Sequence, residues 1–109
     1  MNLNEYQKKA KRTAGRVNIK SDWVYPVLGL VGEAGEVADK VKKIFRDKNG
    51  KISSEDKDAL ISELGDVLWY LSEIASQLDV KLEDVAKANI EKLASRKKRG
   101  KLMGSGDNR

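Results

Sequence analysis

The chain has no cysteine and no histidine among its 109 residues, and only one proline. These absences exclude disulfide bonds, thiol catalysis, serine–histidine triads and the usual zinc ligand sets. No apolar run reaches membrane-spanning length, and the N-terminus lacks the basic-then-apolar layout of a secretion signal. Any chemistry must therefore use carboxylates, lysines, arginines and metal-bound water, and we expect a cytoplasmic protein without a membrane partner.

Aromatic residues are also few, whereas alanine, leucine, lysine and glutamate are frequent, as is typical of helices. The pattern predicts four helices, over about residues 3–13, 23–46, 53–79 and 82–99, and we expect the first helix to stop at Gly15. Pro26 falls in the first turn of the second helix, where its missing N–H is tolerated. We predict an all-α, compact four-helix bundle-like subunit over residues 1–100, with a flexible tail over 101–109. Because a chain of this size has a modest core, a homo-oligomer is expected.

Two acidic pairs lie in the middle of the second and third predicted helices: Glu33 with Glu36, and Glu63 with Asp66. A spacing of three residues places both acids of a pair on neighbouring turns of one helix face. Each pair flanks the apolar stripe of its helix on the same rotational side. The short connection favours an antiparallel hairpin, and both pairs lie roughly 15 Å from the turn. We therefore predict that the four carboxylates converge.

Four converging carboxylates repel one another, by roughly 3 kcal/mol for two charges about 5 Å apart at an effective dielectric near 20. A hard divalent cation relieves this repulsion through oxygen ligands, which points to Mg²⁺, with Mn²⁺ as a substitute. The alternative is that the acids are solvated and pair with nearby lysines, namely Lys40, Lys42 or Lys43. Three mid-helix glycines interleave with the acids and indicate either close approach of a ligand or another helix, or tight core packing: Gly32, Gly35 and Gly65.

The net charge of +5 is concentrated near the end of the fourth predicted helix, where five basic residues lie between Ser95 and Lys101. Such a cluster attracts phosphates of a nucleotide or a nucleic acid, or it is a solvated helix end that suits the helix dipole. Asn89, Lys92 and Arg96 follow the i, i+3, i+7 spacing of a single helix face, so they can act on one ligand. The alternative is that they form an ordinary polar face.

Aromatic side chains are the candidates for stacking on a base, although they are more often core or interface anchors. Trp23 and Tyr70 are possible base contacts. Trp69 lies opposite the apolar stripe of its helix, and we expect it to contact a partner subunit.

At these residues the chain resembles the MazG-like members of the all-α nucleoside triphosphate pyrophosphohydrolases. The resemblance spans nearly the whole chain, with its strongest matches at residues 29–37 (GLVGEAGEV), 63–71 (ELGDVLWYL) and 89–93 (NIEKL). It implies a Mg²⁺-dependent enzyme that splits a nucleoside triphosphate, often a non-standard one, into the monophosphate and pyrophosphate. It also implies a homo-oligomer, with a tetramer favoured and a dimer as the other form.

The resemblance further implies roles for single residues. Glu33, Glu36, Glu63 and Asp66 would hold the metal, and Asn89, Lys92 and Arg96 would contact the phosphates. Glu33 or Glu36 is also the candidate to accept a proton from the attacking water. The alternative function is a small helical nucleic-acid-binding module that uses the basic end of the fourth helix. Nucleic acid is the less favoured partner, because this alternative leaves the matched acidic pairs unexplained.

Overall fold

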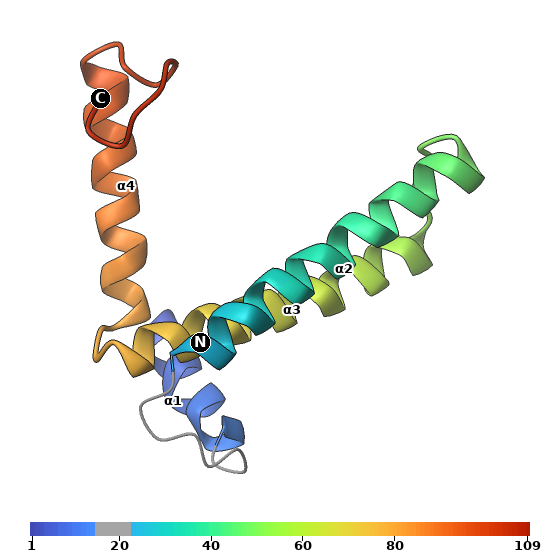
Figure 1. Ribbon diagram of the computed structural model, residues 1–109, viewed down its shortest axis with the longest axis horizontal. Helices are drawn as coiled ribbons and strands as arrows, with labels where there is room; N and C mark the ends of the chain where they lie inside the picture. The colour runs from blue at the N-terminus through green and yellow to red at the C-terminus, as the bar shows by residue number, and fades with distance from the viewer. Residues whose placement is uncertain (15–22) are drawn as a thin grey trace.

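A computed structural model describes residues 1–14 and 23–109 of the chain (Figure 1). These residues form four helices and no strand: α1 (Leu3–Ala14), α2 (Val24–Lys48), α3 (Ser54–Gln77) and α4 (Leu82–Lys98). The all-α, four-helix prediction is confirmed, and the helix ends lie close to the predicted ones. The predicted stop of the first helix at Gly15 lies outside the described residues.

The longest helices, α2 and α3, lie side by side and run antiparallel (Figure 1). Their connection begins with Asn49 and Gly50, whose φ angles of 58° and 77° are in the left-handed region that these two residue types tolerate best. The start of α3 is a capping box. The Asp56 N–H donates to Ser53 Oγ at 3.1 Å, and the Ser53 N–H donates to Asp56 Oδ2 at 2.9 Å. Local chemistry therefore fixes the hairpin that carries the four acids.

The starting point of α4 is fixed by α1. The Gln7 side chain donates to Ser76 Oγ at 3.1 Å and to the Val80 carbonyl at 3.0 Å, and it accepts the Leu82 N–H at 2.9 Å. Asn4 adds a hydrogen bond to Glu83 Oε2 at 2.8 Å. Within the described residues α4 contacts α1 and α3 but not α2. It therefore projects away from the hairpin (Figure 1).

Few apolar side chains are buried within the single chain. The buried ones in the described ranges are Ala10, Pro26, Ile44, Ala75 and Leu82, whereas Leu28, Val31 and Ile61 are each about two-thirds exposed, at 65%, 66% and 65%. The radius of gyration is 16.9 Å, against about 13 Å expected for a compact domain of this length, because α4 stands apart. Much apolar surface is thus free to contact another molecule.

None of the helices in the described part of the chain combines the length and the apolar character needed to cross a bilayer. Residues 101–109 leave α4 and turn back along its last turns (Figure 1). The flexibility of this segment stays a prediction.

Candidate metal centre

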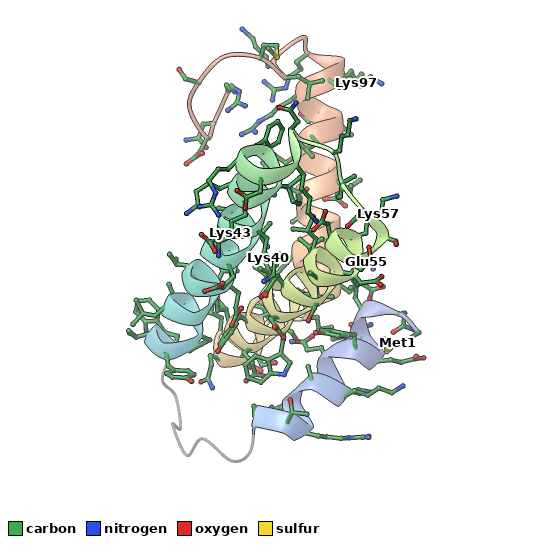
Figure 2. The ribbon with its side chains drawn as sticks, turned by 90° about the vertical axis from the view of Figure 1, so that its right-hand side faces the viewer. Met1, Lys40, Lys43, Glu55, Lys57 and Lys97 are labelled. Atoms are coloured by element: carbon green, nitrogen blue, oxygen red, sulfur yellow. The ribbon has the colours of Figure 1, made fainter. Side chains whose placement is uncertain are left out.

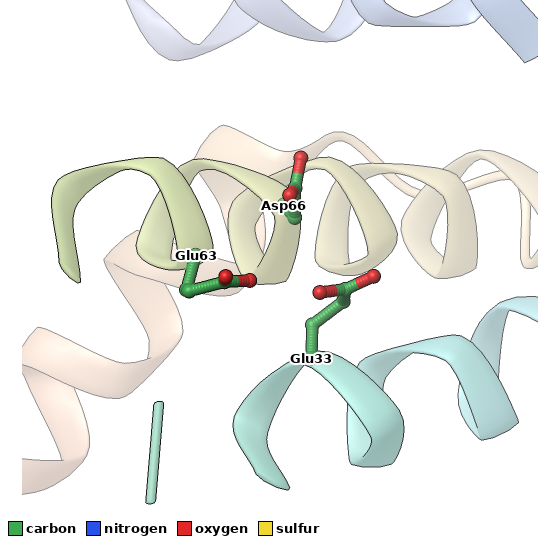
Figure 3. Close-up of side chains that lie close together, drawn as sticks. All are labelled: Glu33, Glu63 and Asp66. Atoms are coloured by element: carbon green, nitrogen blue, oxygen red, sulfur yellow. The ribbon is translucent and has the colours of Figure 1, made fainter. Parts of the chain in front are cut away.

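Three of the predicted acids meet on one flank of the α2–α3 hairpin. Glu33 from α2, and Glu63 and Asp66 from α3, each offer a carboxylate oxygen, and these oxygens all lie within 4.8 Å of one another. Figure 3 shows the Glu33 side chain extending from α2 toward the two acids of α3. Glu33 and Glu63 are half-buried and Asp66 is exposed, so the group is open to solvent on one side.

The fourth acid, Glu36, is exposed and does not belong to this group of oxygens. Its negative charge still acts on the group, since it contributes to raising the pKa of Glu33. The structure therefore brings together three of the four predicted ligands and leaves Glu36 beside them.

The electrostatics of the group disfavour a further negative charge. The pKa of Glu33 is raised first by desolvation, then by the charge of Asp66, by a hydrogen bond and charge repulsion from Glu63, and by the charge of Glu36. A carboxylate whose ionised form is disfavoured in this way is stabilised by any cation that enters the group.

Lysines of α2 neutralise part of this charge. Lys40 Nζ lies 3.0 Å from Glu63 Oε1, and Figure 2 shows Lys40 on the side of α2 that faces α3. Lys42 and Lys43 pair instead with Asp39, at 2.8 and 2.6 Å, and hold the pKa of that acid at about 2. Within the described residues, pairing with lysine thus accounts for Glu63 but for neither Glu33 nor Asp66.

The donor set fits a hard divalent cation. Three carboxylates with no nitrogen or sulfur ligand suit Mg²⁺ or Mn²⁺, whose remaining positions are filled by water or substrate oxygens. Thiolate and imidazole ligands are excluded, since the chain has neither cysteine nor histidine.

Tyr70 lies near the acids. Its pKa is raised mainly by desolvation, then by the neighbouring Tyr25, and further by the charges of Glu33 and Asp66. Its ring lies over Gly29, where a Cβ atom would overlap the ring. The ring centroids of Tyr25 and Tyr70 are 6.5 Å apart. Trp23, the other predicted base contact, is 56% exposed just before α2.

Tyr25 is a residue that the sequence reasoning missed. A signal for it existed, because Tyr25, Gly29 and Glu33 follow one another at intervals of four and therefore share one face of α2. That face carries the acid, the glycine that admits the Tyr70 ring, and a second aromatic ring.

Trp69 has contacts within its own chain that the sequence did not predict, and its expected contact with a partner subunit stays a prediction. Trp69 is half-buried, its Nε1 donates to Thr13 Oγ1 of α1 at 2.7 Å, and its ring meets Tyr70 edge-on with centroids 5.0 Å apart. The rotational argument considered only the α2–α3 hairpin, and α1 covers the side that it left open.

The predicted phosphate contacts lie on α4, which extends away from the hairpin (Figure 1). Asn89 and Lys92 are exposed, whereas Arg96 is only 7% exposed and donates from Nη2 to the Asp107 carbonyl at 2.7 Å. The single chain therefore does not bring these three residues to Glu33, Glu63 and Asp66.

The sequence of the chain is similar to a known protein family and to two known proteins. Residues 26–100 match the family model described as the MazG nucleotide pyrophosphohydrolase domain, so the match contains all four acids and the three polar residues of α4. The chain is 51% identical to the Gene 37 protein of Mycobacterium phage L5, over the full length of both chains. It is 43% identical to the uncharacterized protein YvdC of Bacillus subtilis (strain 168), over 62% of this chain and 68% of that protein. No solved structure matches it.

Proposed function

Because the chain belongs to the family of MazG nucleotide pyrophosphohydrolase domains, we propose that it hydrolyses a nucleoside triphosphate at the α-phosphate to the monophosphate and pyrophosphate. We further propose that it depends on Mg²⁺, with Mn²⁺ as a substitute. The observation that supports this most directly is the meeting of Glu33, Glu63 and Asp66, from two helices of the matched segment, within 4.8 Å. The nucleobase and the sugar are left open.

Glu33, Glu63 and Asp66 would hold the cation, with Glu36 as a fourth acid beside them. When bound, a divalent cation masks the charge of the triphosphate and makes water more acidic. Glu36 is exposed and lies outside the group of converging oxygens, so it is the better placed of the two candidate bases, Glu33 and Glu36, to accept the proton of the attacking water. Tyr70 and Trp23 are the proposed base contacts.

Asn89, Lys92 and Arg96 are proposed to contact the phosphates, where a cation or amide donor stabilises the charge that builds on the departing pyrophosphate. Since α4 extends away from its own acids, these residues act on a nucleotide held by the acids of another copy. The proposed enzyme is therefore a homo-oligomer, a tetramer or a dimer. The exposed apolar residues of α2 and α3 support this, as do Gly32, Gly35 and Gly65, at which an added Cβ would meet nothing within 4 Å in the described chain.

A panel of ribo- and deoxyribonucleoside triphosphates, incubated with Mg²⁺, Mn²⁺ or EDTA, tests the reaction. We expect monophosphate and pyrophosphate in equal amounts with either metal and no product in EDTA. In water enriched in ¹⁸O, attack at the α-phosphorus places the label in the monophosphate, whereas label in pyrophosphate would show attack at the β-phosphorus. Absence of turnover with every nucleotide, together with salt-sensitive binding to DNA or RNA, would contradict the proposal and support the nucleic-acid module.

A further inference from the structure

Residues 101–109, here called the tail loop, are held against the end of α4 by three arginine side chains. Arg96 Nη2 donates to the Asp107 carbonyl at 2.7 Å, and Arg99 Nη2 donates to the Arg109 carbonyl at 2.8 Å. Arg109 closes the loop on itself, with Nη1 donating to the Gly106 carbonyl at 2.7 Å and Nη2 to the Leu102 carbonyl at 3.3 Å. The loop thus has a defined path made by side-chain to backbone hydrogen bonds.

Glycine allows that path. The end of α4 is a Schellman motif, in which Gly100 has a φ of 67° and the Lys101 N–H donates to the Arg96 carbonyl at 2.7 Å. Further along, Gly104 and Gly106 have φ angles of 107° and 91°, which residues with a side chain rarely adopt. The chain therefore reverses direction after α4 and returns to Arg96 at residues where only glycine does so without strain.

Arg96 is an unusual residue to enclose. It is 7% exposed, its Nε is buried without a hydrogen-bond partner, and no carboxylate of the described residues forms an ion pair with it. A buried guanidinium without a counter-charge is costly, and it is not explained by stability. A phosphate that reached the remaining exposed part of this side chain would supply the missing counter-charge.

We propose that the tail loop is a positioning device, which holds the Arg96 guanidinium in one orientation so that it binds a phosphate of the triphosphate without first being ordered. This inference rests on the proposed function, because it takes Arg96 as a phosphate contact. Fixing a long side chain before binding removes an entropic cost from the binding step. Arg109 is then a positioning residue, since it closes the loop that carries the Asp107 carbonyl and acts on substrate only through Arg96.

The test compares Arg109→Ala with Lys98→Ala. Both remove one positive charge near the end of α4, but Lys98 is exposed and makes no hydrogen bond or ion pair within the described residues, so only the first change opens the loop. We expect Arg109→Ala to raise the KM for the triphosphate about tenfold with kcat changed less than about twofold, the size of a weakened charge-assisted hydrogen bond. Lys98→Ala should change both by less than about twofold. Equal effects of the two variants would overturn the inference, as would a lower KM in Arg109→Ala, which would show that the loop shields Arg96.

A double-mutant cycle with Arg96→Ala separates positioning from direct contact. If Arg109 acts through Arg96, adding Arg109→Ala to Arg96→Ala leaves KM unchanged, whereas two multiplying effects would assign Arg109 an independent role and overturn the inference. Circular dichroism checks that each variant keeps its helices.

Calorimetry of tripolyphosphate binding in EDTA tests the role of the loop without requiring hydrolysis. It therefore separates this inference from the proposed function. If the protein binds tripolyphosphate but hydrolyses no nucleotide, the proposed function fails. The inference about the loop is still supported if Arg109→Ala binds tripolyphosphate about tenfold more weakly and Lys98→Ala does not. If the unaltered protein does not bind tripolyphosphate, or binds it equally in both variants, the inference about the loop is overturned.

Discussion

At the scale of single residues, Glu33 is the acid on which the metal centre depends most clearly. It is the one contribution of α2 to the group, and burial together with three neighbouring carboxylates raises its pKa. A folded-state pKa above the unfolded value means that the folded protein loses stability as the pH rises through this range, until a cation compensates the charge.

We predict that Glu33→Gln raises the melting temperature of the metal-free protein at pH 7, because it removes this repulsion. The same change should lower turnover by at least about a hundredfold and abolish the increase in melting temperature that Mg²⁺ gives. Thermal unfolding with and without Mg²⁺, alongside the nucleotide assay, measures both. Glu91→Gln, an exposed acid of α4, is the control and should change neither. Full activity in Glu33→Gln would remove Glu33 from the ligand set.

Helical periodicity predicts part of the acidic site from the sequence. The approach of Glu33, Glu63 and Asp66 follows from the angle of about 100° per residue and from the matched distances to the turn. The exclusion of Glu36 does not follow from this rule, because Asp66 has the same three-residue offset from its partner acid and is also exposed, yet belongs to the group. The Lys40–Glu63 pair depends on the rotamers of two long side chains, and no spacing rule chooses among Lys40, Lys42 and Lys43.

At the scale of elements, the α2–α3 hairpin is fixed by its capping box. The hydrogen bond from Lys48 is the largest cause that lowers the pKa of Asp56 from 3.8 to about 2, and hydrogen bonds from the Ser53 N–H and hydroxyl contribute less. A depressed pKa means that the stabilisation is present above about pH 4 and is lost as the pH falls toward 2.

We predict that Asp56→Asn destabilises the fold at neutral pH and that its stability approaches that of the unaltered protein as the pH falls from 4 to 2. Ser53→Ala should cost about 1 kcal/mol, the usual cost of losing an N-cap hydroxyl. Urea unfolding at several pH values measures both. Asp58→Asn serves as the control, since Asp58 is exposed on the same helix and pairs with no cation in the described chain. An equal effect of the two Asp→Asn changes at pH 7 would show that the capping box contributes nothing.

The sequence predicts this hairpin well because its signals are local: a capping serine, an acid three residues later, and Asn49-Gly50 at the turn. The attachment of α1 is different. Gln7 bonds to Ser76, Val80 and Leu82, partners that are 69 to 75 positions away along the chain. Periodicity assigns α1 to a helix but does not say which surface it covers, and for this reason the environment of Trp69 was not predicted.

At the scale of the whole molecule, the exposed apolar residues of the α2–α3 hairpin indicate a surface that binds another molecule. Ile61 and Leu64 of α3 are 65% and 55% exposed, and Leu28 and Val31 of α2 are exposed to a similar degree. Exposed large apolar side chains, when they gather on one surface, mark an interaction site in soluble proteins.

We predict that Ile61→Glu weakens self-association by at least about tenfold, because it replaces an apolar contact with a charge that must be desolvated. Sedimentation velocity over a concentration series measures the change. Ser62→Glu, which adds the same charge at the next, exposed position, is the control and should leave the association unchanged. A protein that sediments as a monomer at every concentration would refute the homo-oligomer.

The described residues bury few apolar side chains and α4 projects from the hairpin, which has a consequence for the behaviour of the subunit in dilute solution. When association supplies the missing burial, folding and assembly become a single concentration-dependent equilibrium. For the proposed homo-oligomeric enzyme, dilution would then expose the helices to proteases, and the specific activity would fall with the protein concentration. A cell that makes few copies would contain mostly unassembled chains, and output would rise more steeply than expression.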